Sequence, residues 1–331
     1  MVITISLLIN LFLSFLVQKQ DGQVYTITGN AQGTTYQITY LQNDEVVVKN
    51  QVDSILNKID SSLSLYKTYS LINQFNKSDS GCEVDAHLID VVKKSIATYE
   101  KTEGVFDITI KPLVQAWGFG VQAVKSIPDS SEILALRKCM GSKMLILNKN
   151  ILQKSNSCVQ IDCNGIAQGY SVDVLSNFLE KNNIQNYLVE LGGEIRVKGK
   201  NSKNKQWTIG IERPADGADF LPDQQKIYIN KGAVTTSGSY RQWRIEGSKK
   251  LTHIIDPRTG FPVENELISV TVIAHDAMSA DALDNSLMVM GLKRSFDFLS
   301  NMKEVEAFFV YTTDDGLIAD TATKGFYKFL N

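Results

Sequence analysis

Two hydrophobic periodicities follow each other irregularly along this chain, and their order limits the folds that it can adopt. Residues 46–63 repeat apolar side chains at helical spacing, whereas residues 34–40 and 267–274 alternate in the manner of strands. The two patterns mix without the strict strand–helix–strand rhythm of a parallel sheet. The order therefore predicts an α+β, or mixed α/β, protein with largely antiparallel sheets.

Turn and capping residues separate the expected elements. Asp129 or Ser130 caps one helix, and Gly291 ends another. Residues 106–119 mix strand and turn features, and a Gly-Gly pair interrupts the strand expected at 187–197. The expected helices are 46–63, 88–103, 130–139, 165–181 and 277–290, and the expected strands are 24–27, 34–40, 159–161, 187–197, 207–212, 226–229, 267–274 and 305–312.

The composition is that of a globular protein and excludes one large class of partner. The chain has 331 residues, enough for one large domain or two intimately joined ones, with 43% hydrophobic and 21% charged residues. The formal net charge is -2, and no dense Lys/Arg tract occurs. Nucleic acid is therefore not an expected partner.

The first residues differ from the rest of the chain. Residues 2–17 are nearly all apolar, and a polar stretch follows them at once. This pattern predicts that residues 1–20 are a signal peptide or an N-terminal membrane anchor, and that residues 21–331 form the functional domain. The alternative is a buried first strand or helix.

Four cysteines lack the spacing of a zinc cluster. Export to an oxidising compartment would allow Cys139 and Cys158 to form a disulfide. Buried free thiols are an equally acceptable interpretation.

One glycine-containing turn leads from the expected strand 159–161 into the helix 165–181. The free N–H groups and the dipole at a helix N-terminus suit a phosphate group. Gly165 and Gly169 allow a close backbone approach. Packing between a strand and a helix explains the same glycines.

The late helix carries oxygen-bearing side chains on one face. Asp281 and Asn285 are four residues apart, and Asp284 borders them. Mg²⁺ binds one or two carboxylates together with waters and substrate phosphates, so this face predicts a magnesium site. The alternative is a set of acids that complements the helix dipole.

Two further segments carry groups suited to chemistry. His253 precedes an Asp-Pro-Arg-Thr-Gly turn, and imidazole titrates near neutral pH. Residues 232–241 offer hydroxyls, Ser237 among them, for a phosphate or a ribose. A structural histidine and a solvated turn are the alternatives.

The order of these segments and the residues in them resemble those of the ApbE family, the FAD:protein FMN transferases. The resemblance implies an α+β fold of two intimately packed αβ halves, with the flavin between them. The matching segments begin at residue 33 and end at residue 291, and they are 33–36, 64–66, 70–76, 106–109, 112–114, 117–120, 162–173, 190–195, 233–240, 253–260 and 280–291.

The resemblance also assigns roles to individual residues. The metal set is the backbone carbonyl of Gly165 with the side chains of Asp281 and Asn285. Asp284 borders the nucleotide and, like His253, is a candidate base for the acceptor hydroxyl. The residues expected at FAD are Gln32, Tyr66, Val105, Phe106, Asp107, Asp162, Gln168, Ser237, Ile255 and Asp284.

Three of these positions depart from the family pattern. Gln32 stands where Met is usual, and Asn285 stands where Thr is typical. Gln168 replaces a common Lys or Glu, which removes a charge beside the phosphates. An amide oxygen still binds Mg²⁺, so the expected metal site remains.

The activity implied by the resemblance is Mg²⁺-dependent transfer of FMN from FAD to a Thr or Ser hydroxyl, with release of AMP. The acceptor would be a flavoprotein subunit of a membrane redox complex. The protein would be exported, to the periplasm or the extracytoplasmic side of the inner membrane. The alternatives are an Mg²⁺-dependent FAD pyrophosphatase and an FAD carrier without turnover.

Overall fold

The structure is a computed structural model that describes residues 22–124, 126–211, 225–240, 243–246 and 249–330. The predicted signal or anchor segment, residues 1–20, lies outside the described residues. None of the helices in these described ranges is long and apolar enough to cross a membrane.

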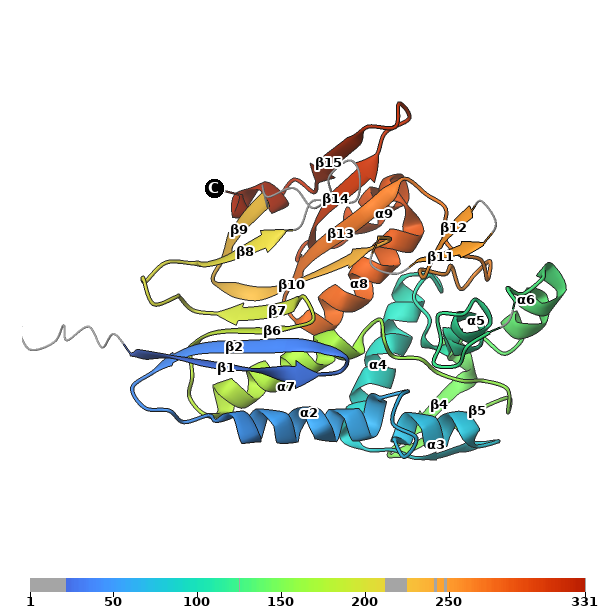
Figure 1. The fold of residues 1–331 in the computed structure, drawn as a ribbon, viewed down its shortest axis with the longest axis horizontal. Coiled ribbons are helices and arrows are strands. Elements are labelled where there is room, and N and C mark those ends of the chain that lie inside the picture. Colours follow the sequence, from blue (N-terminus) through green and yellow to red (C-terminus); the bar gives the residue numbers. More distant parts are fainter. Residues whose placement is uncertain (1–21, 125, 212–224, 241–242, 247–248, 331) are drawn as a thin grey trace, which may run out of the picture.

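One large antiparallel sheet organises the molecule (Figure 1). Its strands alternate between buried and exposed side chains, as in β2, where Tyr36, Ile38 and Tyr40 point into the core. In spatial order the strands are β1 (Gln23–Ala31), β2 (Thr34–Gln42), β6 (Asn186–Leu191), β7 (Glu194–Lys198), β10 (Lys231–Gly238), β13 (Leu267–Ala274), β14 (Glu306–Thr312) and β15 (Ile318–Ala322).

Three smaller antiparallel sheets accompany it. The hairpin of β11 and β12 lies beside α5 and α6 at the right of Figure 1. The three sheets are β3 (Gly81–Glu83), β5 (Ile151–Lys154) and β4 (Leu145–Asn148); β8 (Trp207–Ile211) and β9 (Gln225–Ile229); and β11 (Trp243–Glu246) and β12 (Lys249–Thr252). The described strand pairs are all antiparallel, which confirms the predicted α+β class.

Helices α7 and α8 pack together against the large sheet, and α2 and α4 pack on them in turn. Helix α2 buries one stripe at helical spacing, from Val52 to Leu63, because its apolar residues recur every three or four positions. The helices are α2 (Lys49–Leu63), α3 (Leu71–Lys77), α4 (Ala86–Lys101), α5 (Lys111–Ala116), α6 (Ser130–Arg137), α7 (Ala167–Lys181), α8 (Ala277–Met290) and α9 (Leu292–Leu299).

Three predictions from the sequence are wrong in detail. The expected strand 187–197 is the hairpin of β6 and β7, because Gly192 and Gly193 both take positive φ and reverse the chain. The expected strand 159–161 is irregular, since Ile161 bonds through its backbone N and O to the side chain of Asn76. Residues 106–119 contain a short 3-10 helix and α5, which has a proline as its second residue, instead of a strand.

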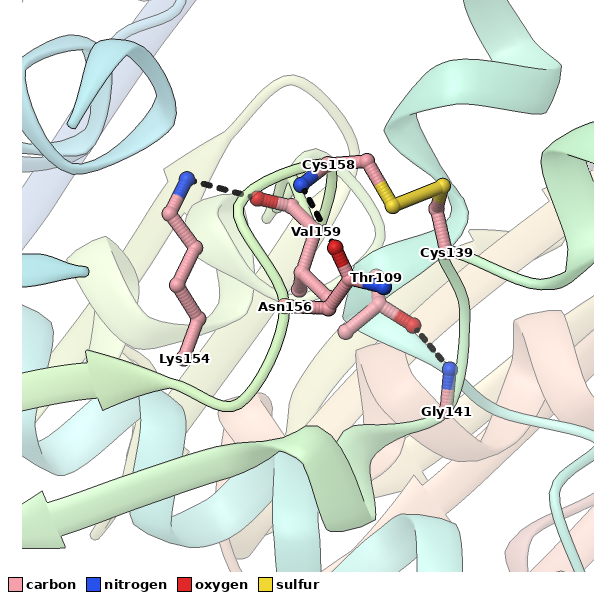
Figure 2. The surroundings of a disulfide bond; sticks show 7 residues. All are labelled: Thr109, Cys139, Gly141, Lys154, Asn156, Cys158 and Val159. Atoms are coloured by element: carbon pink, nitrogen blue, oxygen red, sulfur yellow. Dashed lines mark hydrogen bonds between the residues drawn. A yellow bond between two sulfur atoms is a disulfide. The ribbon is translucent and has the colours of Figure 1, made fainter. Parts of the chain in front are cut away.

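A disulfide joins Cys139, after α6, to Cys158, after β5 (Figure 2). Nearby, the Gly141 N–H donates to Thr109 Oγ1 at 2.7 Å. The remaining thiols are Cys163, which is buried, and Cys82, which is half-buried. The pairing that the sequence left open is therefore present, and it ties two loops together close to the segment that holds Asp107.

Candidate active site

Helix α8 is the platform of the candidate site, and two aspartates hold its first turn. Asp276 is the N-cap and accepts a hydrogen bond from Ser279 N at 2.8 Å. Asp173, on α7, accepts from Ala277 N at 3.0 Å and from Met278 N at 2.8 Å. These carboxylates satisfy N–H groups that have no partner within the helix, so α8 is fixed in place relative to α7.

Helices α7 and α8 approach each other at Gly169. A Cβ atom at this position would lie 2.4 Å from the carbonyl oxygen of Ala277, so only glycine fits there. The Gly169 N–H donates to Asp281 Oδ2 at 2.8 Å. The carboxylate of Asp281 therefore sits at the positive end of α7.

The predicted metal residues converge beside this crossing. Asn285 Nδ2 lies 3.0 Å from Asp284 Oδ1, 3.3 Å from Asp281 Oδ1 and 3.5 Å from Gly165 O. From β10, Ser237 Oγ donates to Asn285 Oδ1 at 3.3 Å. The structure thus brings together residues from α8, from the turn before α7 and from the end of β10.

Burial and neighbouring acids perturb both aspartates. Burial raises the pKa of Asp281 to about 7. The pKa of Asp284 is raised well above its usual range, first by burial and then by the charge of Asp281. Glu194 and Asp173 add further negative charge, and sequence reasoning did not single out either of them. This part of the site therefore favours protons or a cation.

The donor set fits Mg²⁺. Two buried carboxylates, an amide and a backbone carbonyl are hard oxygen ligands, and Mg²⁺ completes such sets with water and substrate phosphates. Within the described residues, no group of three or more His, Cys, Asp or Glu side chains forms a closed metal site. The oxygen ligands and the lack of a closed cluster both agree with a metal site in which the protein supplies part of the ligands and the substrate supplies the rest.

Gln32 lies at the tip of the β1–β2 hairpin, with φ of 52°. Its Nε2 donates to Ser171 Oγ on α7 at 2.7 Å. Its Oε1 is buried and has no hydrogen-bond partner among the described residues. Gln168, in the first turn of α7, lies against the turn between β6 and β7. Its Nε2 is 2.7 Å from the point where a Cβ on Gly192 would lie. The tips of the β1–β2 and β6–β7 hairpins therefore meet the first two turns of α7.

The segment 105–107 lies against the turn before α7. Asp162 N donates to the backbone O of Ile108 at 2.7 Å, which joins the two segments. Burial raises the pKa of Asp162 and of Asp107. Val105 and Phe106 are buried, and Phe106 also borders Gly165.

Three further predicted residues lie on other segments of the chain. The His253 ring follows β12 and packs edge-on against Phe119, with 6.3 Å between ring centroids. Ile255 is buried in a small core with Trp117. The Tyr66 side chain, after α2, is 68% exposed.

A cavity of about 430 Å³ lies at the other end of α8, around Gly291 and Glu266. None of the predicted site residues lines it. The cavity is therefore separate from the cluster around Asp281.

The comparisons with known proteins all point to the same family. The sequence model of the ApbE family matches residues 32–309. A FAD:protein FMN transferase of Vibrio cholerae is 35% identical over 321 residues, 95% of each chain. The Escherichia coli K12 protein of the same name is 35% identical over 283 residues, 82% of this chain and 80% of that one.

Solved structures agree with the sequences. The flavin transferase ApbE from Vibrio cholerae superimposes with a TM-score of 0.84 at 35% identity, over 93% of this chain and 100% of that chain. The apo form of the Pseudomonas stutzeri flavinyl transferase ApbE gives a TM-score of 0.84 at 30% identity, over 93% and 97%. With its fold, its sequence and the residues around α8 in agreement, this chain belongs to the ApbE family.

Proposed function

We propose that this protein transfers FMN from FAD to a Thr or Ser hydroxyl of an acceptor flavoprotein in an Mg²⁺-dependent reaction that releases AMP. The observation that carries the proposal is the convergence of Gly165 O, Asp281, Asp284 and Asn285 at the crossing of α7 and α8. The family relatives named FAD:protein FMN transferase support it.

The metal would be held by Asp281, Asn285 and the carbonyl of Gly165. Bound Mg²⁺ supplies charge neutralisation for the pyrophosphate of FAD. The protein holds the Asp281 carboxylate in place beforehand, because the Gly169 N–H donates a hydrogen bond to it. Such preorganisation lowers the cost of arranging charge during the reaction.

The other residues would position the nucleotide and the acceptor. Gln32, Gln168 and Asp162 lie around the start of α7, whose positive end suits phosphate oxygens. The acceptor oxygen attacks the FMN phosphorus, the bond to the AMP oxygen breaks, and AMP leaves with the electron pair. His253 takes the proton of the acceptor hydroxyl, with Asp284 as the alternative base.

The acceptor is proposed to be a flavoprotein subunit of a membrane redox complex, outside the cytoplasm. The disulfide between Cys139 and Cys158 supports export, since disulfides persist in oxidising compartments. The apolar run at residues 2–17 supports a signal peptide or an N-terminal membrane anchor.

One assay separates the three candidate activities. The protein is incubated with FAD and Mg²⁺, with and without an acceptor that carries a Thr site, and AMP is measured. A transferase releases AMP mainly when the acceptor is present, a pyrophosphatase releases it in both cases, and a carrier releases none. AMP that is independent of the acceptor would overturn the transferase assignment.

The proton acceptor is tested by His253→Ala and His253→Gln, with Asp284→Asn in parallel. If His253 is the base, we expect a loss of roughly 100-fold or more in the transfer rate, with FAD binding retained. Unchanged transfer in both His253 variants would remove His253 from the mechanism. A loss confined to Asp284→Asn would move the role to that carboxylate.

A further inference from the structure

The amide nitrogen of Asn285 occupies a point where oxygens crowd together. Besides the contacts already given with Asp284, Asp281 and Gly165, it lies 2.9 Å from the backbone O of Asp281. A side-chain amide has only two N–H hydrogens, so four oxygens share two donors. Oxygens gathered in this way around one electropositive group resemble the surroundings of a cation.

The neighbours of Asn285 determine which way its amide faces. Ser237 Oγ donates to Oδ1 on the outer side, at 3.3 Å. A flipped amide would point Oδ1 at the carboxylates of Asp281 and Asp284, which repel an oxygen unless a proton or a cation lies between. The hydrogen-bond network therefore assigns the nitrogen to the inner side.

We propose that Asn285 is a latch with two positions: in the metal-free protein its amide nitrogen faces the oxygens of the metal site, and when Mg²⁺ binds the amide turns and presents its oxygen to the metal. The Ser237 hydroxyl serves both positions, because it donates to Oδ1 in one and accepts from Nδ2 in the other. The metal-free protein thereby keeps two buried carboxylates together without a bound cation.

The latch has a measurable consequence for metal affinity. Mg²⁺ binds only after the amide has turned, so the apparent affinity is reduced by the fraction of molecules in the open position. Threonine at position 285 has one hydroxyl hydrogen and cannot bridge the same oxygens. The variant Asn285→Thr therefore removes the latch while keeping an oxygen ligand.

The first test measures melting temperature in EDTA and in Mg²⁺, and Mg²⁺ affinity by calorimetry without FAD. The inference rests on the magnesium site of the proposed function, but this test needs neither flavin nor acceptor. We expect Asn285→Thr to lower the melting temperature in EDTA by roughly 3–6 °C. With Mg²⁺ the difference should largely close, and the dissociation constant should fall by up to about tenfold.

The matched control is Asn265→Thr. Asn265 also uses its amide on α8, donating to Met288 O at 2.8 Å, but it lies near the other end of the helix. This variant should lower the melting temperature equally in EDTA and Mg²⁺ and leave the affinity unchanged. If Asn285→Thr behaved in the same way, or bound Mg²⁺ more weakly at unchanged metal-free stability, the latch would be wrong.

Side-chain NMR signals supply a second measurement. In protein labelled with ¹⁵N-asparagine, the amide signals of Asn285 are identified by their loss in Asn285→Thr. Saturating Mg²⁺ should shift these signals and leave those of Asn265 in place. Mg²⁺ binding without any shift at Asn285 would refute the latch alone, whereas no Mg²⁺ binding by the wild type would refute the metal site of the proposed function as well.

Discussion

Gly169 N donates a 2.8 Å hydrogen bond to Asp281 Oδ2 across the crossing of α7 and α8. The same glycine leaves no room for a side chain, because a Cβ would lie 2.4 Å from Ala277 O and 2.8 Å from Asp281 Cβ. The close packing of two helices and the placement of a site carboxylate therefore depend on one residue.

The variant Gly169→Ala tests this dependence. The added methyl group must push α7 and α8 apart, so we expect a loss of about 2 kcal/mol or more in the free energy of unfolding. The control is Gly165→Ala, whose Cβ would meet its nearest neighbour, Asn285 Nδ2, at an ordinary 3.5 Å. Denaturant titration of both variants measures the difference, and equal stability losses would contradict the account.

The pair of Arg196 and Asp173 is expected to stabilise the platform under the site. Arg196 Nη1 lies 2.7 Å from Asp173 Oδ1, with side chains that are 15% and 9% exposed. Removing the guanidinium leaves a buried carboxylate without its cation, so Arg196→Met should cost about 3 kcal/mol. In a double-mutant cycle with Asp173→Asn, the double variant should lose less stability than the sum of the two single variants. Losses that simply add would contradict the pairing.

The disulfide should stabilise the folded protein through the loop that it closes. Cys139 and Cys158 are 19 residues apart, and closing a loop of this size stabilises a protein by about 3 kcal/mol. Reduction with dithiothreitol should lower the melting temperature of the wild type. The variant Cys139→Ser, Cys158→Ser should be equally destabilised and insensitive to the reductant. A wild type unaffected by reduction would count against this prediction.

Asp107 is expected to make stability depend on pH. Burial raises the pKa of Asp107 in the folded protein, although hydrogen bonds from Thr109 and Ser142 oppose the shift. The folded state then holds the proton more tightly than the unfolded chain, so this residue favours folding at low pH and opposes it as pH rises through the raised pKa. The stability of Asp107→Asn relative to the wild type should therefore increase between pH 4 and pH 8. A constant difference in melting temperature over this range would be inconsistent with the raised pKa.

Local patterns predicted the elements whose ends carry their own signals. Strand 267–274 and helix 277–290 have the expected bounds, because Asp276 caps the helix and Gly291 ends it. Helix α3 was not identified, although Ser70 caps it, because seven residues give too little periodicity. Residues 159–161 read as a strand, but a side chain distant in the sequence supplies their hydrogen bonds.

The site was predictable only in part, for a related reason. The spacing of Asp281 and Asn285 places them on one helix face, and their side chains do meet. The carbonyl of Gly165 carries no signal in its own side chain, and only the family resemblance pointed to it. Asp173 and Arg196 were missed as a pair, since their contact forms only when α7 packs against β7.

The central claim is tested most directly by mass spectrometry of an acceptor protein with a Thr site, after incubation with this protein, FAD and Mg²⁺. The account predicts a mass gain equal to FMN on that threonine, and its loss both in EDTA and with the variant Asp281→Asn. An acceptor that stays unmodified while FAD is cleaved to FMN and AMP would contradict the account, as would a mass gain that persists in the Asp281→Asn variant.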